Sequence, residues 1–166
     1  MLQETLVILK PDAIERKLSG EIISRFEKEC FEIIDLKYIK KASKDIIIKH
    51  YPDSLALGIG KKAQQAIPNI EDPRTHGLNV LRKLRKYLMR GPIIVIRFRG
   101  ENAINEVRRI TGYTDPSIAE KGSIRGDLGL DSITKSTKED RVCENLVHAS
   151  GNLDEAETEL KLWFSN

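Results

Sequence analysis

The chain has 166 residues, of which 40% are hydrophobic and 32% charged, with a formal net charge of +3. This balance is typical of a globular protein, and the length favours one domain over residues 1–166. The near-neutral charge and the aromatic content of 5% argue against a dedicated nucleic-acid-binding protein. No apolar stretch approaches the ~18–20 residues that span a bilayer. Neither a basic, apolar leader nor paired cysteines are visible, so we expect a cytoplasmic protein without a membrane partner.

Strands and helices alternate along the first third of the chain. The elements expected there are a strand over 4–10, a helix over 19–30, a strand over 31–40 and a short helix over 43–50. Residues 52–77 then carry three prolines and three glycines. This composition predicts mostly surface loop, with a short helix near 61–67.

The second half of the chain repeats the alternation. The elements expected there are a helix over 78–90, a strand over 93–99, a helix over 101–111, a long loop over 113–130, a short helix over 137–141, a strand over 145–149 and a last helix over 152–164. Four strands in this order favour an α+β fold, a ferredoxin-like βαββαβ sandwich with a four-stranded antiparallel sheet, helices on one face, extra helices and a loop-rich insert. A small doubly wound sheet is the alternative topology.

One histidine stands in a context that suits nucleophilic chemistry. His148 lies in N-L-V-H-A-S-G, where strand alternation predicts that Leu146, His148 and Ser150 share one face. Small neighbours leave its ring accessible. Glu159 in the following helix is placed to hold one ring nitrogen as N–H and leave the other nucleophilic. The other two histidines, including His50, are interpreted as structural or surface residues.

Three cations stand at the ends of elements, where ligands bind. Lys10 ends the first strand, and Arg125 lies in the glycine-flanked I-R-G-D segment. At 100° per residue, Arg108 borders the buried face of its helix, whereas Arg109 points away from that face. Arginine forks and a lysine point charge suit a polyphosphate. No P-loop sequence is present, so any phosphate binding must come from such side chains.

Several short motifs occur together in a recognisable order. They are K-P-D-A from residue 10, H-Y at 50–51, G-Y-T-D-P from 112, G-S-I-R-G-D from 122, N-L-V-H-A-S from 145 and E-x-x-L-W-F from 159. This ensemble resembles the nucleoside diphosphate kinase family over nearly the whole chain except 52–77. The resemblance implies the ferredoxin-like fold and ping-pong transfer of the γ-phosphate of a nucleoside triphosphate, typically ATP, to a nucleoside diphosphate.

The resemblance also implies roles for individual residues. His148 would become phosphorylated and Glu159 would orient it, with Ser150 supporting the site from behind. Lys10 and Asn145 would bind the sugar hydroxyls, with Lys10 also near the transferred phosphate and Tyr51 packed beside it. The residues that would grip the phosphates are Arg108, Thr114 and Arg125. Mg²⁺ would bind through the nucleotide phosphates, with no protein metal cage.

The sequence departs from the family pattern in places. Gly151 replaces an aspartate that usually follows the histidine–serine pair, and residues 52–77 form a longer, family-variable insert without the usual base-stacking phenylalanine. The resemblance favours a homo-oligomer, a hexamer over a tetramer. Two other functions stay open at this level: a non-catalytic nucleotide-sensing module, and a nucleic-acid-binding ferredoxin-like domain.

Overall fold

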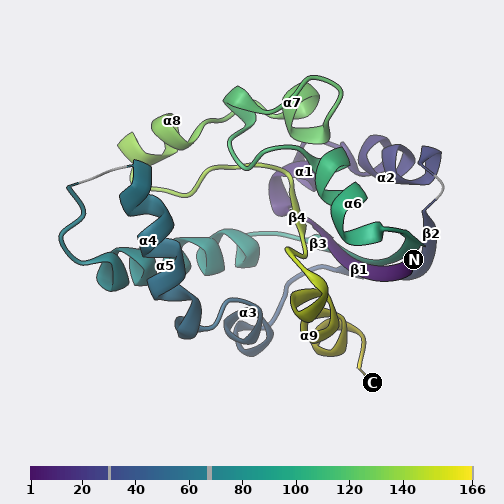
Figure 1. Ribbon diagram of the computed structural model, residues 1–166, viewed down its shortest axis with the longest axis horizontal. Helices are drawn as coiled ribbons and strands as arrows, with labels where there is room; N and C mark the ends of the chain where they lie inside the picture. The colour runs from purple at the N-terminus through teal and green to yellow at the C-terminus, as the bar shows by residue number, and fades with distance from the viewer. Residues whose placement is uncertain (30, 67–68, 166) are drawn as a thin grey trace.

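The sheet of the protein has the predicted topology. The computed structural model describes residues 1–29, 31–66 and 69–165 (Figure 1). The strands are β1 (Leu2–Leu9), β2 (Glu32–Ile39), β3 (Ile93–Glu101) and β4 (Val147–Ala149). They form one sheet in the order β2-β3-β1-β4, and every neighbouring pair is antiparallel. The ferredoxin-like prediction is therefore confirmed, and the doubly wound alternative, which requires parallel strands, is excluded.

Helices cover both faces of this sheet, not one face as the sequence analysis predicts. Figure 1 shows α2 (Ser19–Lys28) and α6 (Ala103–Thr111) above the sheet, and α3 (Lys44–His50) and α9 (Leu153–Phe164) below it. Each layer has its own apolar core: Val7 and Leu9 of β1 face α2 and α6, while Leu6 and Ile8 face the other layer. Leu6 to Leu9 are all fully buried. A continuous apolar run of this kind is typical of a strand covered on both sides.

Most of the described residues within 52–77 are helical, so the prediction of a mostly loop segment is wrong. A 3₁₀ turn, η1 (Asp53–Leu55), leads into α4 (Ala56–Ala66), and α5 (Pro73–Met89) follows with Asp72 as its N-cap. Two of the glycines are helix contacts and not turns. A Cβ on Gly60 would lie 1.6 Å from the Pro73 carbonyl oxygen, and one on Gly77 would lie 1.8 Å from that of Ala56. The α4–α5 hairpin needs glycine because the two backbones touch.

The remaining elements are short. They are α1 (Pro11–Glu15), η2 (Pro116–Ile118), α7 (Ile124–Leu128) and α8 (Ile133–Lys138). The predicted loop over 113–130 thus contains a 3₁₀ turn and one helix, and the helix expected over 137–141 begins earlier because Ser132 caps it. The predicted end of the first long helix at Cys30 lies outside the described residues.

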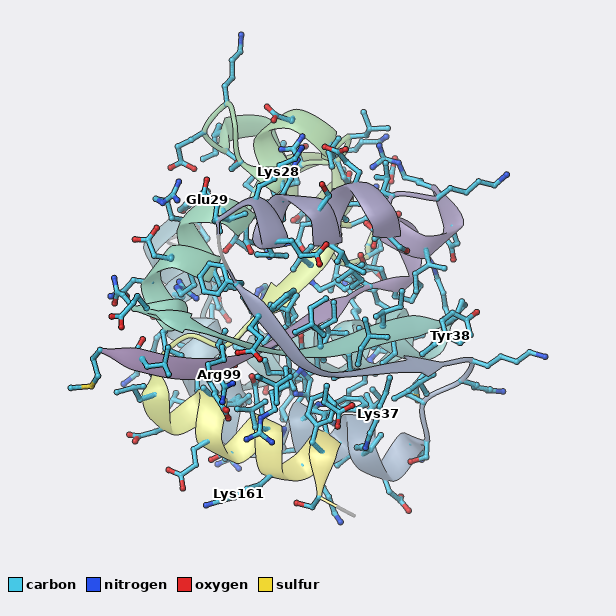
Figure 2. All side chains as sticks on the ribbon, turned by 90° about the vertical axis from the view of Figure 1, so that its right-hand side faces the viewer. Lys28, Glu29, Lys37, Tyr38, Arg99 and Lys161 are labelled. Atoms are coloured by element: carbon cyan, nitrogen blue, oxygen red, sulfur yellow. The ribbon has the colours of Figure 1, made fainter. Side chains whose placement is uncertain are left out.

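One edge of the sheet is formed by β2, which faces the viewer in Figure 2, and the other by β4. The Leu36 and Tyr38 side chains of β2 are exposed, and a register shift interrupts its pairing with β3 between Ile33 and Asp35. By contrast Phe98, the aromatic residue on β3, is fully buried. Tyr38 is therefore the one exposed aromatic side chain on the described strands, fewer than the set of strand aromatics with which a sheet stacks successive RNA bases. Within the described residues, no helix has the length and apolar character of a membrane span.

Candidate active site

One cleft collects most of the predicted site residues. It has a volume of about 670 Å³ and lies between the ends of β1 and β4, the segment after α6, and the α4–α5 hairpin. The predicted residues that line it are Lys10, Tyr51, Arg108, Thr114, Arg125, Asn145 and His148. Glu159 and Ser150 lie behind His148 and contact it or each other. All nine residues are thus brought to one place by the fold.

The backbone just before His148 is tightly turned. Leu146 has φ +67°, and the Val147 N–H donates to the Asn145 carbonyl at 2.7 Å, closing a three-residue turn. This turn breaks the strand alternation before β4 begins. Leu146 therefore packs in the α2–α6 core, whereas His148 lies on the α9 side, so the prediction that both share one face is wrong.

The imidazole of His148 is held from behind by one carboxylate. Its Nε2 lies 2.8 Å from Oε1 of Glu159, whose other oxygen accepts a hydrogen bond from Ser150 Oγ at 2.6 Å. Burial alone raises the pKa of Glu159, but His148 and the hydrogen bonds bring that pKa below its usual value. The ionised carboxylate keeps the proton on Nε2. Nδ1 is left with a free lone pair on the cleft side.

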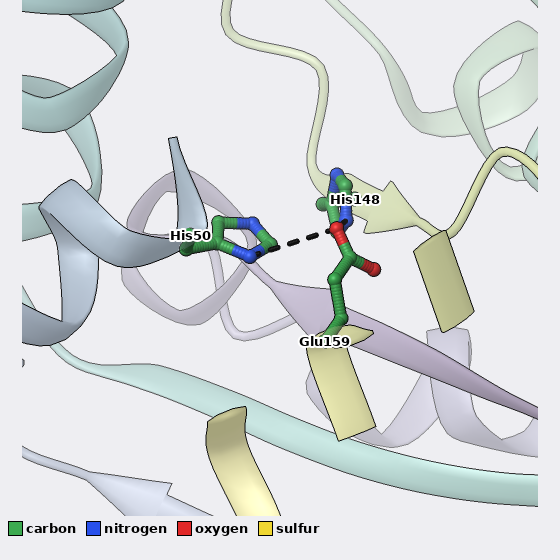
Figure 3. A group of neighbouring side chains, drawn as sticks. All are labelled: His50, His148 and Glu159. Carbon is green, nitrogen blue, oxygen red and sulfur yellow. Dashed lines mark hydrogen bonds and ion pairs between the residues drawn. The ribbon is translucent and has the colours of Figure 1, made fainter. Parts of the chain in front are cut away.

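A second histidine completes this cluster, as Figure 3 shows. His50, which the sequence analysis interprets as structural or surface, is buried with its ring centroid 4.6 Å from that of His148. Burial and the neighbouring His148 lower its pKa to about 3, so it stays neutral. The Trp163 indole N–H donates to His50 Nδ1 at 3.3 Å. Nδ1 of His50 is then a hydrogen-bond acceptor. It lies 3.6 Å from Glu159 Oε1 and does not compete with His148 for that oxygen.

The same geometry bears on metal binding. One nitrogen each from His50 and His148 and one oxygen of Glu159 all lie within 4.8 Å of one another, a spacing that could hold a metal ion. However, the Trp163 N–H already occupies the lone pair of His50 Nδ1. The hydrogen bonds of the cluster thus engage His50 Nδ1 and Glu159 Oε1, two atoms that a metal ion would need.

Lys10 is buried at the end of β1. Its Nζ donates to Asn145 Oδ1 at 2.6 Å, and the Asn145 amide donates to the Thr114 carbonyl at 2.8 Å. Burial, together with the positive charge of Arg125, lowers the pKa of Lys10 to about 7. An anion in the cleft would restore the charged form. The lysine is therefore ready to gain a proton when a phosphate binds.

Arg125 is fixed by three backbone carbonyls. Its guanidinium donates to the carbonyls of Asn145 at 3.1 Å, Gly112 at 3.0 Å and Val147 at 2.5 Å. Burial is the main cause that lowers its pKa to about 10, so it remains charged at neutral pH. This positions a cation beside His148, and no acidic side chain among the described residues pairs with it to cancel its charge.

The two arginines near the end of α6 behave as their helical phase predicts. Arg108 lines the cleft and forms no ion pair with the described residues. Arg109 points away and pairs with Glu106 at 2.7 Å and Glu29 at 3.1 Å.

Three residues that were not predicted from the sequence also shape the cleft. Asp12 is buried, and its carboxylate accepts hydrogen bonds from Tyr87 Oη at 2.6 Å and from the Leu146 N–H at 3.1 Å, tying α1, α5 and the turn together. Lys62 of α4 and Leu84 of α5 line the far side of the cleft. Asp12 could have been predicted from its place in the K-P-D-A motif. No local sequence motif indicates that Lys62 or Leu84 lines the cleft.

Comparison with known proteins places these features in a family. A family model described as "Nucleoside diphosphate kinase" matches residues 3–58 and 74–166. A curated relative named nucleoside diphosphate kinase from Pyrobaculum aerophilum is 42% identical, with 98% of this chain and 95% of the relative covered. One from Pyrococcus abyssi is 40% identical, with 98% and 84% covered.

Solved structures agree with the sequence matches. A crystal structure of an NDP kinase from Pyrobaculum aerophilum has a TM-score of 0.92 at 39% identity, covering 100% of this chain and 97% of the other. A transition state mimic of the nucleoside-diphosphate kinase from Borrelia burgdorferi, with bound vanadate and ADP, has a TM-score of 0.85 at 30% identity, with 99% and 88% covered. The chain therefore belongs to the nucleoside diphosphate kinase family.

Proposed function

We propose that the protein transfers the γ-phosphate of a nucleoside triphosphate to a nucleoside diphosphate, with His148 as the carrier. In the first half-reaction, the Nδ1 lone pair attacks the γ-phosphorus, and the bond to the β-phosphate oxygen breaks to release the diphosphate. A second nucleotide then takes the phosphoryl group from Nδ1 by the reverse displacement. The observation that carries this proposal is the His148 Nε2–Glu159 contact of 2.8 Å, which leaves Nδ1 free toward the cleft.

The surrounding residues divide the other tasks between them. Phosphoryl transfer mainly requires positioning and neutralisation of charge on the phosphoryl oxygens. Lys10, Arg108 and Arg125 supply positive charge in the cleft, and Thr114 lines it beside them. As positive charge builds on the imidazole, Glu159 stabilises it from the Nε2 side. Asn145 holds Lys10 in place and stays available to the sugar hydroxyls.

Tyr51 packs beside the reacting histidine. Its ring centroid lies 6.1 Å from that of His148, and burial is the main cause that raises the pKa of its hydroxyl. The phenol is therefore neutral at physiological pH. In the proposed reaction it acts as a hydrogen-bonding group and not as a base.

Magnesium fits this site only as a partner of the nucleotide. The one carboxylate that lines the cleft among the described residues is Glu155, which already accepts hydrogen bonds from the Gly151 N–H and the Asn152 side-chain amide. A single carboxylate plus phosphate oxygens is a common way to hold Mg²⁺. Bound in this way, the ion would neutralise phosphate charge.

Phosphoenzyme formation tests the proposal directly. We expect ATP labelled at the γ-phosphate to give the protein an acid-labile, alkali-stable label. His148→Ala should abolish it, while His76→Ala, which removes a histidine of α5 remote from the cleft lining, should retain it. Absence of label on the unaltered protein, or a label that survives His148→Ala, would contradict the mechanism.

The setting of the enzyme is part of the same proposal. We propose a cytoplasmic protein of one domain, in which 52–77 is a family-variable insert. The unmatched residues 59–73 of the family comparison support this. We also propose a homo-oligomer, a hexamer over a tetramer, and the exposed Leu36 and Tyr38 on the edge strand β2 support self-association. Light scattering coupled to size-exclusion chromatography tests it: a monomer at micromolar concentration would be incompatible.

A further inference from the structure

The far wall of the cleft contains a cation that the proposed mechanism does not use. Lys62 of α4 and Leu84 of α5 line the same cavity as Lys10, Arg108, Arg125 and His148. The residues that match the family model stop at 58 and resume at 74, so Lys62 has no counterpart in that model. Lys62 therefore adds a positive charge to the cleft from a segment outside the residues that match the family model.

Several contacts hold α4 in place. The Gly60 backbone lies against Pro73, and the Ala56 backbone lies against Gly77, so closely that neither glycine has room for a side chain. At the hairpin turn, Gln64 Nε2 donates to the Ile70 carbonyl at 2.8 Å. Because Lys62 lies between these fixed points, its Cα position is set by packing and only its flexible side chain needs to move.

Contacts at the start of the hairpin fix it to the rest of the site. Arg85 of α5 donates to the Tyr51 carbonyl at 2.9 Å and pairs with Asp53 at 2.6 Å. Tyr51 itself lines the cleft. The wall that carries Lys62 is thus anchored directly to the residue packed beside His148.

The charge of Lys62 is not cancelled. It is exposed and forms no ion pair or hydrogen bond with the part of the chain that the structure describes. Two other cations of the hairpin are paired: Arg85 pairs with Asp53, and Lys83 pairs with Asp140 at 2.5 Å. The cleft carboxylate, Glu155, is engaged by Gly151 and Asn152. A free ammonium on the wall of a cleft that three other cations also line is placed to pair with a bound polyanion.

We propose that Lys62 is a further nucleotide-binding residue, whose ammonium pairs with the phosphate chain of the bound nucleotide from the insert side of the cleft. This inference rests on the proposed function, because it requires a polyphosphate in the cleft. The ammonium acts as a flexible point charge, in contrast to the fixed Arg125 fork. It contributes to binding of the donor and the acceptor alike, because both occupy the same cleft in turn.

Steady-state kinetics of Lys62→Ala test the inference, with Lys61→Ala as the matched control. Lys61 is the exposed neighbour on α4 and does not line the cleft. For Lys62→Ala we expect KM for nucleoside diphosphates to rise roughly threefold to fivefold, the size of one partly exposed ion pair. The limiting kcat should be unchanged. Lys62→Arg should restore KM, and the KM difference should vanish in high salt because screening removes the contribution of the charge.

The choice of nucleotide separates a phosphate contact from a base contact. A phosphate contact predicts the same fold-change for ADP, GDP and CDP, whereas an effect confined to one base would overturn the inference. Equal KM values for Lys62→Ala and Lys61→Ala would overturn it as well. Labelling of His148 in the unaltered protein is scored separately: label with no Lys62 effect rejects only the inference, whereas absence of label rejects the proposed function.

Discussion

The two walls of the cleft are built in opposite ways. On the sheet side, Lys10, Arg125 and Asn145 are buried and connected by hydrogen bonds to one another or to backbone carbonyls. On the hairpin side, Lys62 is exposed and Leu84 half-buried, and the order there comes from backbone packing between two helices. In the first wall, the polar side chains are held in position to bind a negative charge. In the second wall, the backbone is held in position but the side chains can be substituted more freely.

This difference explains where the family pattern is kept. The sheet wall lies in the segments that match the family model, and a change there leaves a buried polar group without its partner. The hairpin wall falls partly in the unmatched residues 59–73, where replacement of an exposed side chain changes the free energy of unfolding little.

Glu159, which supports His148 from behind the sheet-side wall, should affect the rate of phosphoryl transfer without affecting nucleotide binding. Glu159→Gln removes the charge that stabilises the His148 imidazolium, and we expect kcat to fall roughly 100-fold. KM should be unchanged because Glu159 does not line the cleft. Glu157→Gln is the control, since Glu157 is exposed on the same helix and pairs with Lys161. A rise in KM at constant kcat would place Glu159 in substrate binding instead.

The platform on the hairpin side should depend on its glycines. Gly77→Ala places a Cβ 1.8 Å from the Ala56 carbonyl oxygen, and we expect a loss of about 2 kcal/mol in the free energy of unfolding. Gly58→Ala on α4 meets nothing within 4 Å and should stabilise the protein by about 0.5–1 kcal/mol, because alanine favours helix. Denaturant unfolding measures both. Changes of the same sign would mean that the helices do not touch at Gly77.

The arginines of α6 test whether an exposed cation on the sheet side contributes to kcat/KM. Arg108→Ala should lower kcat/KM roughly tenfold or more, because a charge-assisted contact to phosphate is lost. Arg109→Ala should be nearly silent in kinetics because Arg109 pairs with Glu106 and Glu29. Equal losses in the two variants would show that the face of α6 is assigned wrongly.

The buried lysine of the sheet wall should make nucleotide binding pH-dependent. Burial and Arg125 lower the pKa of Lys10 to about 7, and a bound polyphosphate raises it again. Binding above pH 7 then requires proton uptake, so the Kd for a nucleoside diphosphate should rise about fivefold from pH 7 to pH 8. Calorimetry in two buffers of different ionisation enthalpy measures this uptake. Lys10→Arg, which keeps its charge, should abolish the pH dependence; a flat profile in the unaltered protein would refute the coupling.

The elements were predictable wherever local sequence determines local structure. The apolar strands β1 and β3 follow from hydrophobic patterning, and the caps Ser43 and Asn152 mark the starts of α3 and α9. The family resemblance, carried by motifs along the chain, is confirmed by the family model and by the relatives. The helical phase that separates Arg108 from Arg109 also follows from the sequence.

Other features were not accessible because they depend on partners that are distant in sequence. Glycines 60 and 77 look the same in a turn as in a close helix contact, and only the facing backbone distinguishes the two. The exceptional φ of Leu146 is imposed by its surroundings and reverses the face that alternation predicts. His50 became part of the site only when α3 and α9 met beneath β4.

The sequence by itself determined the family, the order of the four strands and the identity of the groups that we propose to surround the phosphate. The tertiary structure determined the charge states and the orientations of those groups. Burial moves the pKa of Lys10, three carbonyls fix Arg125, and hairpin packing brings Lys62 to the cleft. These properties arise from removal of water and from contacts between distant segments. Neither is encoded in any local stretch of residues.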